Sequence, residues 1–208
     1  RDDFCAFILT HGRPDKVHTT RALEKHGYTG KVYYVIDNED KTAKEYYQKF
    51  GKENVLMFDK AEAAKTFDEG DNFDDRRAII YARNVCFDLA EKVGCKYFIQ
   101  LDDDYTNFGY RFHPEKGFVH TPVKDLDRIL ETMLEFYCAT DFLTIAMPQG
   151  GDFIGGIEGS FGKEIIGKRK AMNTFICSTD RPFKFFGRIN EDANPYTNLG
   201  RTGKMFLT

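Results

Sequence analysis

Long apolar stretches are missing from this sequence. No run approaches the roughly 20 consecutive apolar residues that a membrane-spanning helix needs. No signal peptide precedes the first predicted strand, which begins at Phe4. These two absences predict a soluble protein in the cytoplasm, without a membrane partner.

Cysteine is present but lacks the arrangement of a metal site or a disulfide framework. The five cysteines are scattered and odd in number, and none lies in a CxxC or Cys/His metal spacing. We therefore expect reduced thiols in the core. Cys86 and Cys138 fall in apolar helical contexts, where a buried thiol behaves as a small hydrophobic side chain.

Glycine-rich phosphate loops are missing too. Neither GxGxxG nor GxxxxGK[ST] occurs, which argues against a dinucleotide-binding Rossmann domain and against a P-loop enzyme. The pairs Gly150-Gly151 and Gly155-Gly156 lack the spacing and follow the wrong strand. Any bound phosphate must therefore be held by metal and side chains.

The composition is that of one globular domain with unevenly distributed charge. The chain has 208 residues, 41% of them hydrophobic, and a formal net charge of −3. Residues 161–208 hold nine bases and four acids, a net charge of +5, which leaves −8 elsewhere. This basic third could face a polyanion, although a solvated surface explains it equally well. Because the first residue is not Met and residues 205–208 read as an interrupted strand, we also expect truncation at both ends.

Strand-like and helix-like segments alternate along the chain with short connections. This alternation predicts an α/β fold with a mostly parallel, Rossmann-like central sheet flanked by helices. The expected strands are residues 4–10, 31–36, 55–58, 97–101, 141–147 and 171–178, with 183–186 as a candidate for another. The expected helices are residues 16–26, 42–50, 76–93 and 123–138. Residues 60–73 are expected to form a loop near the ligand, and 105–120 an aromatic, turn-rich connection.

Three consecutive carboxylates, Asp102, Asp103 and Asp104, directly follow the apolar strand that begins at Tyr97. Like charges at the end of a buried strand repel one another, and a bound divalent cation offsets that repulsion. In open α/β sheets this edge is also where ligands bind. A solvated acidic turn is the ordinary alternative, but the buried-strand pattern before the acids favours a ligand site.

Further charged residues follow the neighbouring strands. Arg13 comes after the first predicted strand, Asp37 after the second, and Arg83 lies on the helix before the acidic strand. With Asp102 and Asp104 they would meet at one edge, where acids suit ribose hydroxyls and metal, and arginines suit phosphate. Together they predict a nucleoside-diphosphate site. Taken singly, each Asp could be a turn or a helix cap, and each Arg could be a surface residue.

A second acidic pair, Glu191 and Asp192, lies far downstream. Sugar transfer from a diphosphate needs a cation for the leaving group and a carboxylate that deprotonates the acceptor hydroxyl, and the two acidic sites could supply both. The alternative is a helix N-terminus, capped by Asn190, whose dipole the acids complement. The two interpretations are compatible.

These motifs resemble those of glycosyltransferases with the GT-A fold. The likeness lies in LDDD (101–104, the DxD motif), YARN (81–84) and NED (190–192). More narrowly, ILTHGR (8–13), YVIDNED (34–40) and LDDDY (101–105) resemble the phage-type TET-associated glycosyltransferases. That family is thought to attach sugars to hydroxymethylated pyrimidines in DNA. The likeness extends over most of the chain, from Phe4 to near Asn194.

The resemblance implies a single GT-A domain over residues 1–208, with a nucleotide-sugar-binding half (1–104) and an acceptor-binding half (105–208). It implies a UDP-sugar donor, Mn²⁺ or Mg²⁺, and inverting transfer to 5-hydroxymethylcytosine in DNA, in the host cytoplasm if a phage encodes the enzyme. Thr10, Arg13 and Asp37 would contact the nucleoside, and Arg83 would lie near the nucleotide or the sugar.

The resemblance also implies roles for the acidic residues. Asp102 and Asp103 would belong to the donor site, with Asp102 at the ribose or sugar. Asp104, together with Asp102, would ligate the metal that bridges the diphosphate. Asp192, with Glu191 beside it, would be the catalytic base. One departure is that many GT-A enzymes take a further metal ligand, often His, from beyond the acidic pair, whereas no His follows position 120 here.

Aromatic residues in the basic third are candidates for contact with the acceptor. A 5-hydroxymethyl group lies in the major groove of a duplex, so the enzyme must enter that groove or extrude the base. Stacking on a displaced base is one role for these aromatic residues, and a place in the core is the alternative. The set is Phe183, Phe185, Phe186 and Tyr196, interleaved with Lys184 and Arg188.

Three other functions are compatible with these residues. A GT-A enzyme with a protein or glycan acceptor would bind no DNA. A nucleotidyltransferase shares a similar sheet and acidic metal site but usually has a glycine-rich loop after its first strand, and residues 11–13 are poor in glycine. A binding module that has lost turnover would bind UDP without releasing sugar.

Overall fold

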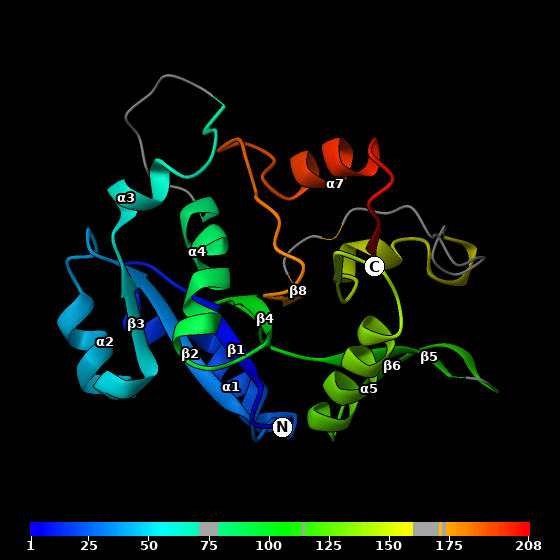
Figure 1. Cartoon of the computed structure of the whole chain (residues 1–208). Coiled ribbons are helices and arrows are strands. Elements are labelled where there is room, and N and C mark those ends of the chain that lie inside the picture. Colours follow the sequence, from blue (N-terminus) through cyan, green and yellow to red (C-terminus); the bar gives the residue numbers. More distant parts are fainter. Residues whose placement is uncertain (71–78, 114, 160–170, 172–173) are drawn as a thin grey trace.

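A seven-stranded central sheet organises the part of the chain that the computed structural model describes, residues 1–70, 79–113, 115–159, 171 and 174–208 (Figure 1). The strand order is β3-β2-β1-β4-β8-β7-β9. The strands are β1 (Phe4–Leu9), β2 (Lys31–Asp37), β3 (Val55–Phe58), β4 (Tyr97–Asp102), β7 (Thr144–Ile145), β8 (Thr174–Ser178) and β9 (Phe206–Leu207).

The first half of this sheet is parallel, as the sequence predicts. β3, β2, β1 and β4 run in one direction, β8 is antiparallel to both β4 and β7, and β9 is parallel to β7. In this register Leu9 lies beside both Val35 and Asp102, and Asp37 lies beside Phe58. The carboxyl ends of four strands therefore meet at one edge of the sheet.

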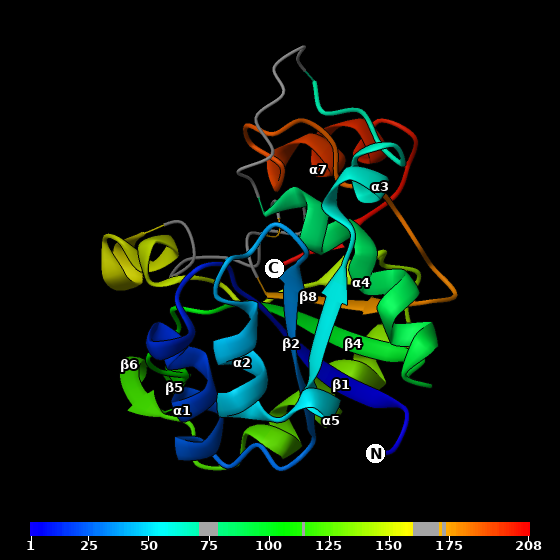
Figure 2. The same cartoon turned by 90° about the vertical axis from the view of Figure 1, so that its left-hand side faces the viewer.

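Helices cover both faces of the sheet (Figures 1 and 2). One core cluster joins α1 (His18–Lys25), α2 (Ala43–Phe50) and α5 (Leu126–Cys138) to the sheet. The other joins α3 (Lys60–Ala64) and α4 (Ile80–Lys92), with α7 (Ala193–Gly200) packed against it. Alternate residues of β1 enter the two clusters, which explains why this strand is apolar throughout.

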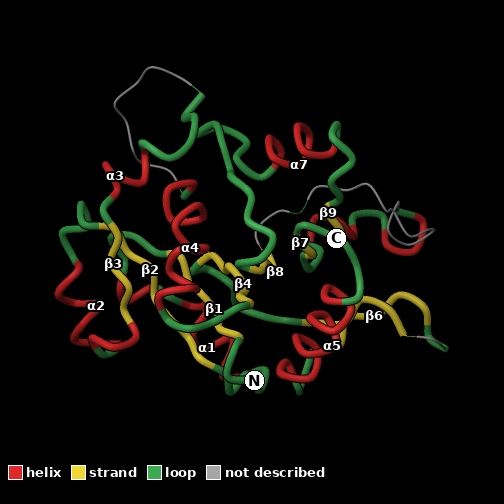
Figure 3. Tube along the Cα trace, viewed as in Figure 1, coloured by secondary structure: helices red, strands yellow, loops and turns green. Residues whose placement is uncertain are grey.

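A separate two-stranded hairpin and several single turns complete the described elements (Figure 3). Antiparallel β5 (Gly109–His113) and β6 (Gly117–Pro122) form the hairpin. The single turns are the 3₁₀ helices η1 (Pro14–Lys16), η2 (Lys52–Asn54), η3 (Gly150–Phe153) and η4 (Gly156–Glu158). The sequence predicted an aromatic, turn-rich connection over 105–120 and missed these two strands, which pair with each other.

Several other local predictions need correction. Part of the loop expected at 60–73 is helix α3, whose N-terminus is capped by the Asp59 carboxylate accepting from the Glu62 N–H at 2.9 Å. Residues 71–73 of that loop and 76–78 of the expected helix lie outside the described residues. Residues 183–186 form no strand. The preceding strand, β8, already has β4 and β7 as its two neighbours, so it has no free edge for them.

The cysteines behave mostly as expected. All five are free, and four are buried, but Cys138 is exposed at the end of α5. The prediction of a core position for Cys138 was wrong, because only one face of this amphipathic helix packs on the sheet. Among the described residues, the structure contains no helix long and apolar enough to cross a membrane.

Candidate active site

A cavity of about 520 Å³ opens where β1, β2 and β4 end. One wall is apolar and is formed by Val35, Phe58, Ile79 and Ala82. The rest of the lining is polar and contains Thr10, His11, Arg13, Asp37, Lys60 and the three aspartates 102–104. The parallel register places these residues together, since each polar group lies at or just beyond the carboxyl end of a strand.

The middle aspartate of the acidic run turns away from solvent and holds the loop after β1. Asp103 is 1% exposed, and its Oδ2 accepts from the Thr10 hydroxyl at 2.7 Å and from Nε of Arg13 at 2.8 Å. A second bond joins Arg13 Nη2 to Oδ1 at 2.5 Å. This hydrogen bonding raises the pKa of Arg13 above its ordinary value, although burial opposes the shift. Asp103 is thus a partner of Arg13, while Arg13 itself remains half-exposed in the cavity.

Replacing Asp103 with Asn is expected to destabilise the fold. The variant weakens charge-assisted bonds to Arg13 and Thr10, and we expect a loss of about 2 kcal/mol, limited by the exposure of Arg13. For a chain of this length that corresponds to a fall in Tm of about 4–8 °C. A thermal melt measures it, with the exposed Asp104→Asn as the matched control. Equal melting of the two variants would contradict this structural role.

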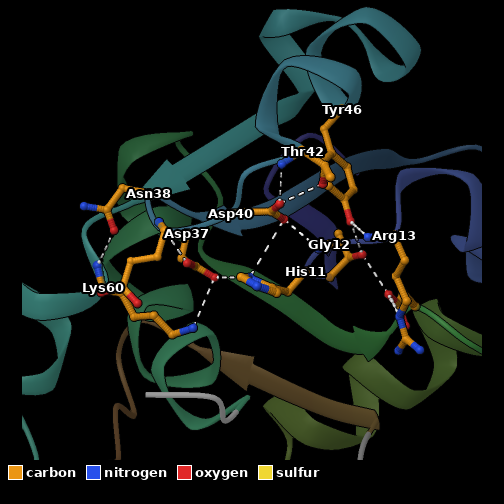
Figure 4. Close-up of polar contacts among 12 residues, drawn as sticks. His11, Gly12, Arg13, Asp37, Asn38, Asp40, Thr42, Tyr46 and Lys60 are labelled. Atoms are coloured by element: carbon orange, nitrogen blue, oxygen red, sulfur yellow. Dashed lines mark hydrogen bonds and ion pairs between the residues drawn. The ribbon is translucent and has the colours of Figure 1, made fainter. Parts of the chain in front are cut away.

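Asp37, at the end of β2, gathers two cationic or protonated groups at the cavity (Figure 4). Its Oδ2 lies 2.7 Å from Nδ1 of His11 and 3.4 Å from Nζ of Lys60, and its Oδ1 accepts from the Glu39 N–H. A carboxylate only accepts hydrogen bonds, so Nδ1 of His11 carries the proton in this contact. Asp37 therefore orients His11 and Lys60 beside the apolar wall.

Sequence reasoning missed Lys60. It is the first residue of α3 and is buried, with its N–H bonded to Asn38 Oδ1 at 3.0 Å and its Nζ 5.6 Å above the Tyr81 ring. The signal was Asp59, an N-cap residue before a short helical pattern, which starts a helix at that edge of the sheet. The burial of a lysine against Asp37 could not be derived from the local pattern.

Asp40 fixes the turn between β1 and the cavity. Its carboxylate accepts from the Gly12 N–H at 2.7 Å and from the N–H and hydroxyl of Thr42 at 2.8 and 2.7 Å. Burial opposes ionisation of Asp40, but these hydrogen bonds outweigh it and lower the pKa. Gly12 has a φ of +69°, which a side chain would strain. The left-handed backbone at Gly12 and the hydrogen bonds to Asp40 together determine where His11 and Arg13 lie (Figure 4).

Arg83, on α4, connects the two acidic sites. It is 2% exposed, with Nη2 at 3.1 Å from Asp102 Oδ1 and Nε at 3.8 Å from Glu191 Oε1. Its guanidinium lies 4.9 Å from the Phe175 ring and 5.9 Å from the Phe185 ring. Within the described residues, its buried Nε and Nη1 have no hydrogen-bond partner. The Arg83 guanidinium thus lies near two carboxylates, that of Asp102 at the end of β4 and that of Glu191 just before α7.

The second acidic pair forms a helix N-terminus, as the alternative interpretation predicted. Asp192 is the N-cap of α7, and its Oδ1 accepts from the Ala193 N–H at 2.9 Å. Asn190, which the sequence suggested as the cap, instead has a φ of +58°. The two acids have different surroundings, since Glu191 faces Arg83 while Asp192 caps the helix. Neither lines the 520 Å³ cavity.

The aromatic residues of the basic third belong largely to the core. Phe183 and Phe185 are 6% and 0% exposed, and Tyr196 packs against the same cluster. Asn84 fixes this segment with two bonds to the backbone of Phe185, at 2.9 and 2.8 Å. The core alternative is therefore confirmed for Phe183 and Phe185, and stacking on a displaced base is excluded for them, because their rings pack against Phe87 of α4 and Phe175 of β8.

The sequence matches one family model over residues 4–208, that of TAGT, the TET-associated glycosyltransferases. The chain belongs to this family. No curated protein gives a significant match. Membership makes this protein an enzyme that transfers a sugar from a donor to an acceptor, and the resemblance seen in the sequence is confirmed.

The carboxylates at the end of β4 fit a cation site that a bound substrate would complete. Asp102 and Asp104 both line the cavity. Across the described parts of the chain, no three His, Cys, Asp or Glu side chains come together as a possible metal cage. Mg²⁺ is typically held by one or two carboxylates plus substrate phosphates rather than by a complete protein cage. Asp102 and Asp104 suit a cation of that kind.

Proposed function

We propose that this glycosyltransferase transfers a sugar from a UDP-sugar to the hydroxyl group of 5-hydroxymethylcytosine in DNA, with inversion and with Mn²⁺ or Mg²⁺. The observation that carries the donor half of this proposal is the common cavity of Asp102 and Asp104 with Arg13, Lys60 and an apolar wall. Carboxylates, cations and an apolar surface are what a metal-bound diphosphate with a planar base requires.

The nucleotide would lie across the carboxyl ends of β1 and β2. Phe58 and Ile79 offer the base an apolar surface, and Arg13 and Lys60 offer the phosphates two cations. A carboxylate has about four acceptor sites, and His11, Lys60 and the Glu39 N–H use three of those on Asp37. The site left on Asp37 suits a ribose hydroxyl, and the Thr10 hydroxyl lies close by.

Asp104 and Asp102 would hold the cation, with Arg83 keeping Asp102 in position. When bound, the cation stabilises the negative charge that develops on the departing diphosphate. On the acceptor side, Asp192 would take the proton from the attacking hydroxyl, with Glu191 held beside it by Arg83. Direct attack with one such base inverts the anomeric centre, by analogy with inverting glycoside hydrolysis.

UDP release from a panel of UDP-sugars with Mn²⁺ tests the proposal. Reactions contain either duplex DNA with 5-hydroxymethylcytosine, the same duplex with cytosine, or no DNA, and EDTA provides the metal-free control. Release stimulated only by the modified duplex is the expected result. Slow release that ignores DNA would refute the DNA acceptor and direct the search to protein or glycan acceptors. No release with any sugar would refute the donor assignment.

A further inference from the structure

A second cavity, of about 900 Å³, lies between the β5–β6 hairpin and the η3 turn. Its walls are rich in aromatic rings, from Tyr105, Phe108, Tyr110, Phe112 and Phe153. Tyr110 and Phe112 are 43% and 45% exposed, which is unusual for side chains with this much apolar surface. The hairpin lies apart from the central sheet (Figure 1), so the sheet leaves these rings uncovered.

The 520 Å³ cavity at the ends of β1, β2 and β4, where we propose that the sugar donor binds, is called the donor cavity below. The charges around the aromatic cavity differ from those of the donor cavity. No Asp or Glu side chain is among its described lining residues, although the chain holds 33 acids and 30 bases. Its basic side chains are Arg111 and His120, and the Arg111 guanidinium lies 5.3 Å from the Phe153 ring. The donor cavity instead contains four aspartates. Carboxylates in the lining would repel an anionic ligand such as a nucleic acid, but would matter little for a neutral glycan. The lack of acids among the described lining residues therefore favours an anionic ligand.

The aromatic cavity borders the acidic strand end. Tyr105 lines it and directly follows Asp104, which lines the donor cavity. The Tyr105 N–H donates to the Thr19 hydroxyl at 3.0 Å, and that hydroxyl donates to the Asp102 carbonyl at 2.6 Å, so Tyr105 is tied to the end of β4. Thr174, which pairs with Leu101 of β4, also lines the cavity. A ligand here would therefore lie next to the donor.

We propose that this cavity binds the acceptor base, unstacked from a nucleic-acid strand, against the exposed rings of Tyr110 and Phe112 on the hairpin. This inference rests on the proposed function and names the part of the molecule that receives its acceptor. Aromatic side chains stack on planar bases, and an arginine beside them contacts the base or the adjacent phosphate. A base that stays in the duplex cannot enter a cavity, so the acceptor nucleotide is extruded or single-stranded.

Binding of a fluorescently labelled single-stranded oligonucleotide with one 5-hydroxymethylcytosine, followed by anisotropy, tests the cavity. Tyr110→Ala and Phe112→Ala are each expected to weaken binding about tenfold, the effect of losing one stacked base. Phe136→Ala is the matched control, because Phe136 is 48% exposed but lies on α5 outside this cavity. Phe112 also packs on Phe118 and Phe153, so a thermal melt of each variant accompanies the titration.

Arg111→Gln provides an independent measurement on the same cavity. If Arg111 contacts a phosphate, the slope of log Kd against log salt falls by about one for this variant. Affinities of the Tyr110 and Phe112 variants equal to those of the parent and Phe136→Ala would overturn the inference. Because binding needs no turnover, this result is separate from the UDP-release assay. Failure there refutes the proposed function, and failure here refutes only the acceptor cavity.

Discussion

Replacing Asp104 with Ala should abolish metal-dependent binding of UDP while the fold survives. Asp104 is exposed and lines the donor cavity, so the protein loses the proposed cation ligand without losing a buried contact. We expect the Kd for UDP in Mn²⁺ to rise by at least about 100-fold, since even outer-shell partners of metal ligands are worth 10- to 100-fold. Isothermal titration with and without Mn²⁺ measures the loss.

A matched control separates this effect from a general change of charge. Asp88→Ala removes an exposed carboxylate from α4, the helix that carries Arg83, but Asp88 does not line the cavity. It should bind UDP and Mn²⁺ like the parent, and both variants should melt at the parent's temperature. If Asp104→Ala binds UDP and Mn²⁺ as the parent does, the metal assignment is wrong.

Replacing Asp192 with Asn should lower the rate of sugar transfer by about 10²- to 10⁴-fold, the usual contribution of a general base. Asn is as good an N-cap as Asp, so α7 keeps its cap and stability should change little. Donor binding should be preserved, because Asp192 does not line the donor cavity. Single-turnover kinetics with saturating UDP-sugar measure the chemical step, and titration with UDP measures donor binding.

Two companion variants make this result specific. Asp192→Ala loses both the carboxylate and the cap, so it should also lose about 1 kcal/mol of stability. Glu191→Gln removes the charge that faces Arg83 and tests whether the neighbouring acid is the base instead. Normal transfer by Asp192→Asn with a large loss in Glu191→Gln would move the base to Glu191. Normal transfer by both would place it elsewhere.

Much of the donor side could be predicted from the sequence. Arg13 and Asp37 follow strands, and parallel pairing brings the carboxyl ends of those strands to one edge, so their meeting with the acidic run at 102–104 follows from chain order. Which aspartate of the run 102–104 is buried and which is exposed could not be predicted from the sequence. The Asp103 side chain is buried and bonds to Thr10 and Arg13, whereas the side chain of the next residue, Asp104, is exposed.

The positions of the exposed aromatic rings were predicted less well. The basic composition of the last third directed attention to Phe183 and Phe185, but these rings are core residues fixed by Asn84. The exposed rings are instead on the hairpin, at Tyr110 and Phe112, where the sequence suggested only an aromatic, turn-rich connection. Aromatic residues in a strand and in a core have the same local pattern, and only the neighbouring elements decide which rings are covered.

The sequence by itself determined the alternation of strands and helices, the family, and the acidic edge, because these depend on periodicity and on the order of elements along the chain. The tertiary structure alone decided that Lys60 pairs with Asp37 and that Arg83 joins Asp102 to Glu191. These contacts join residues far apart in sequence, and they exist because buried charges must find partners wherever the packed elements bring them.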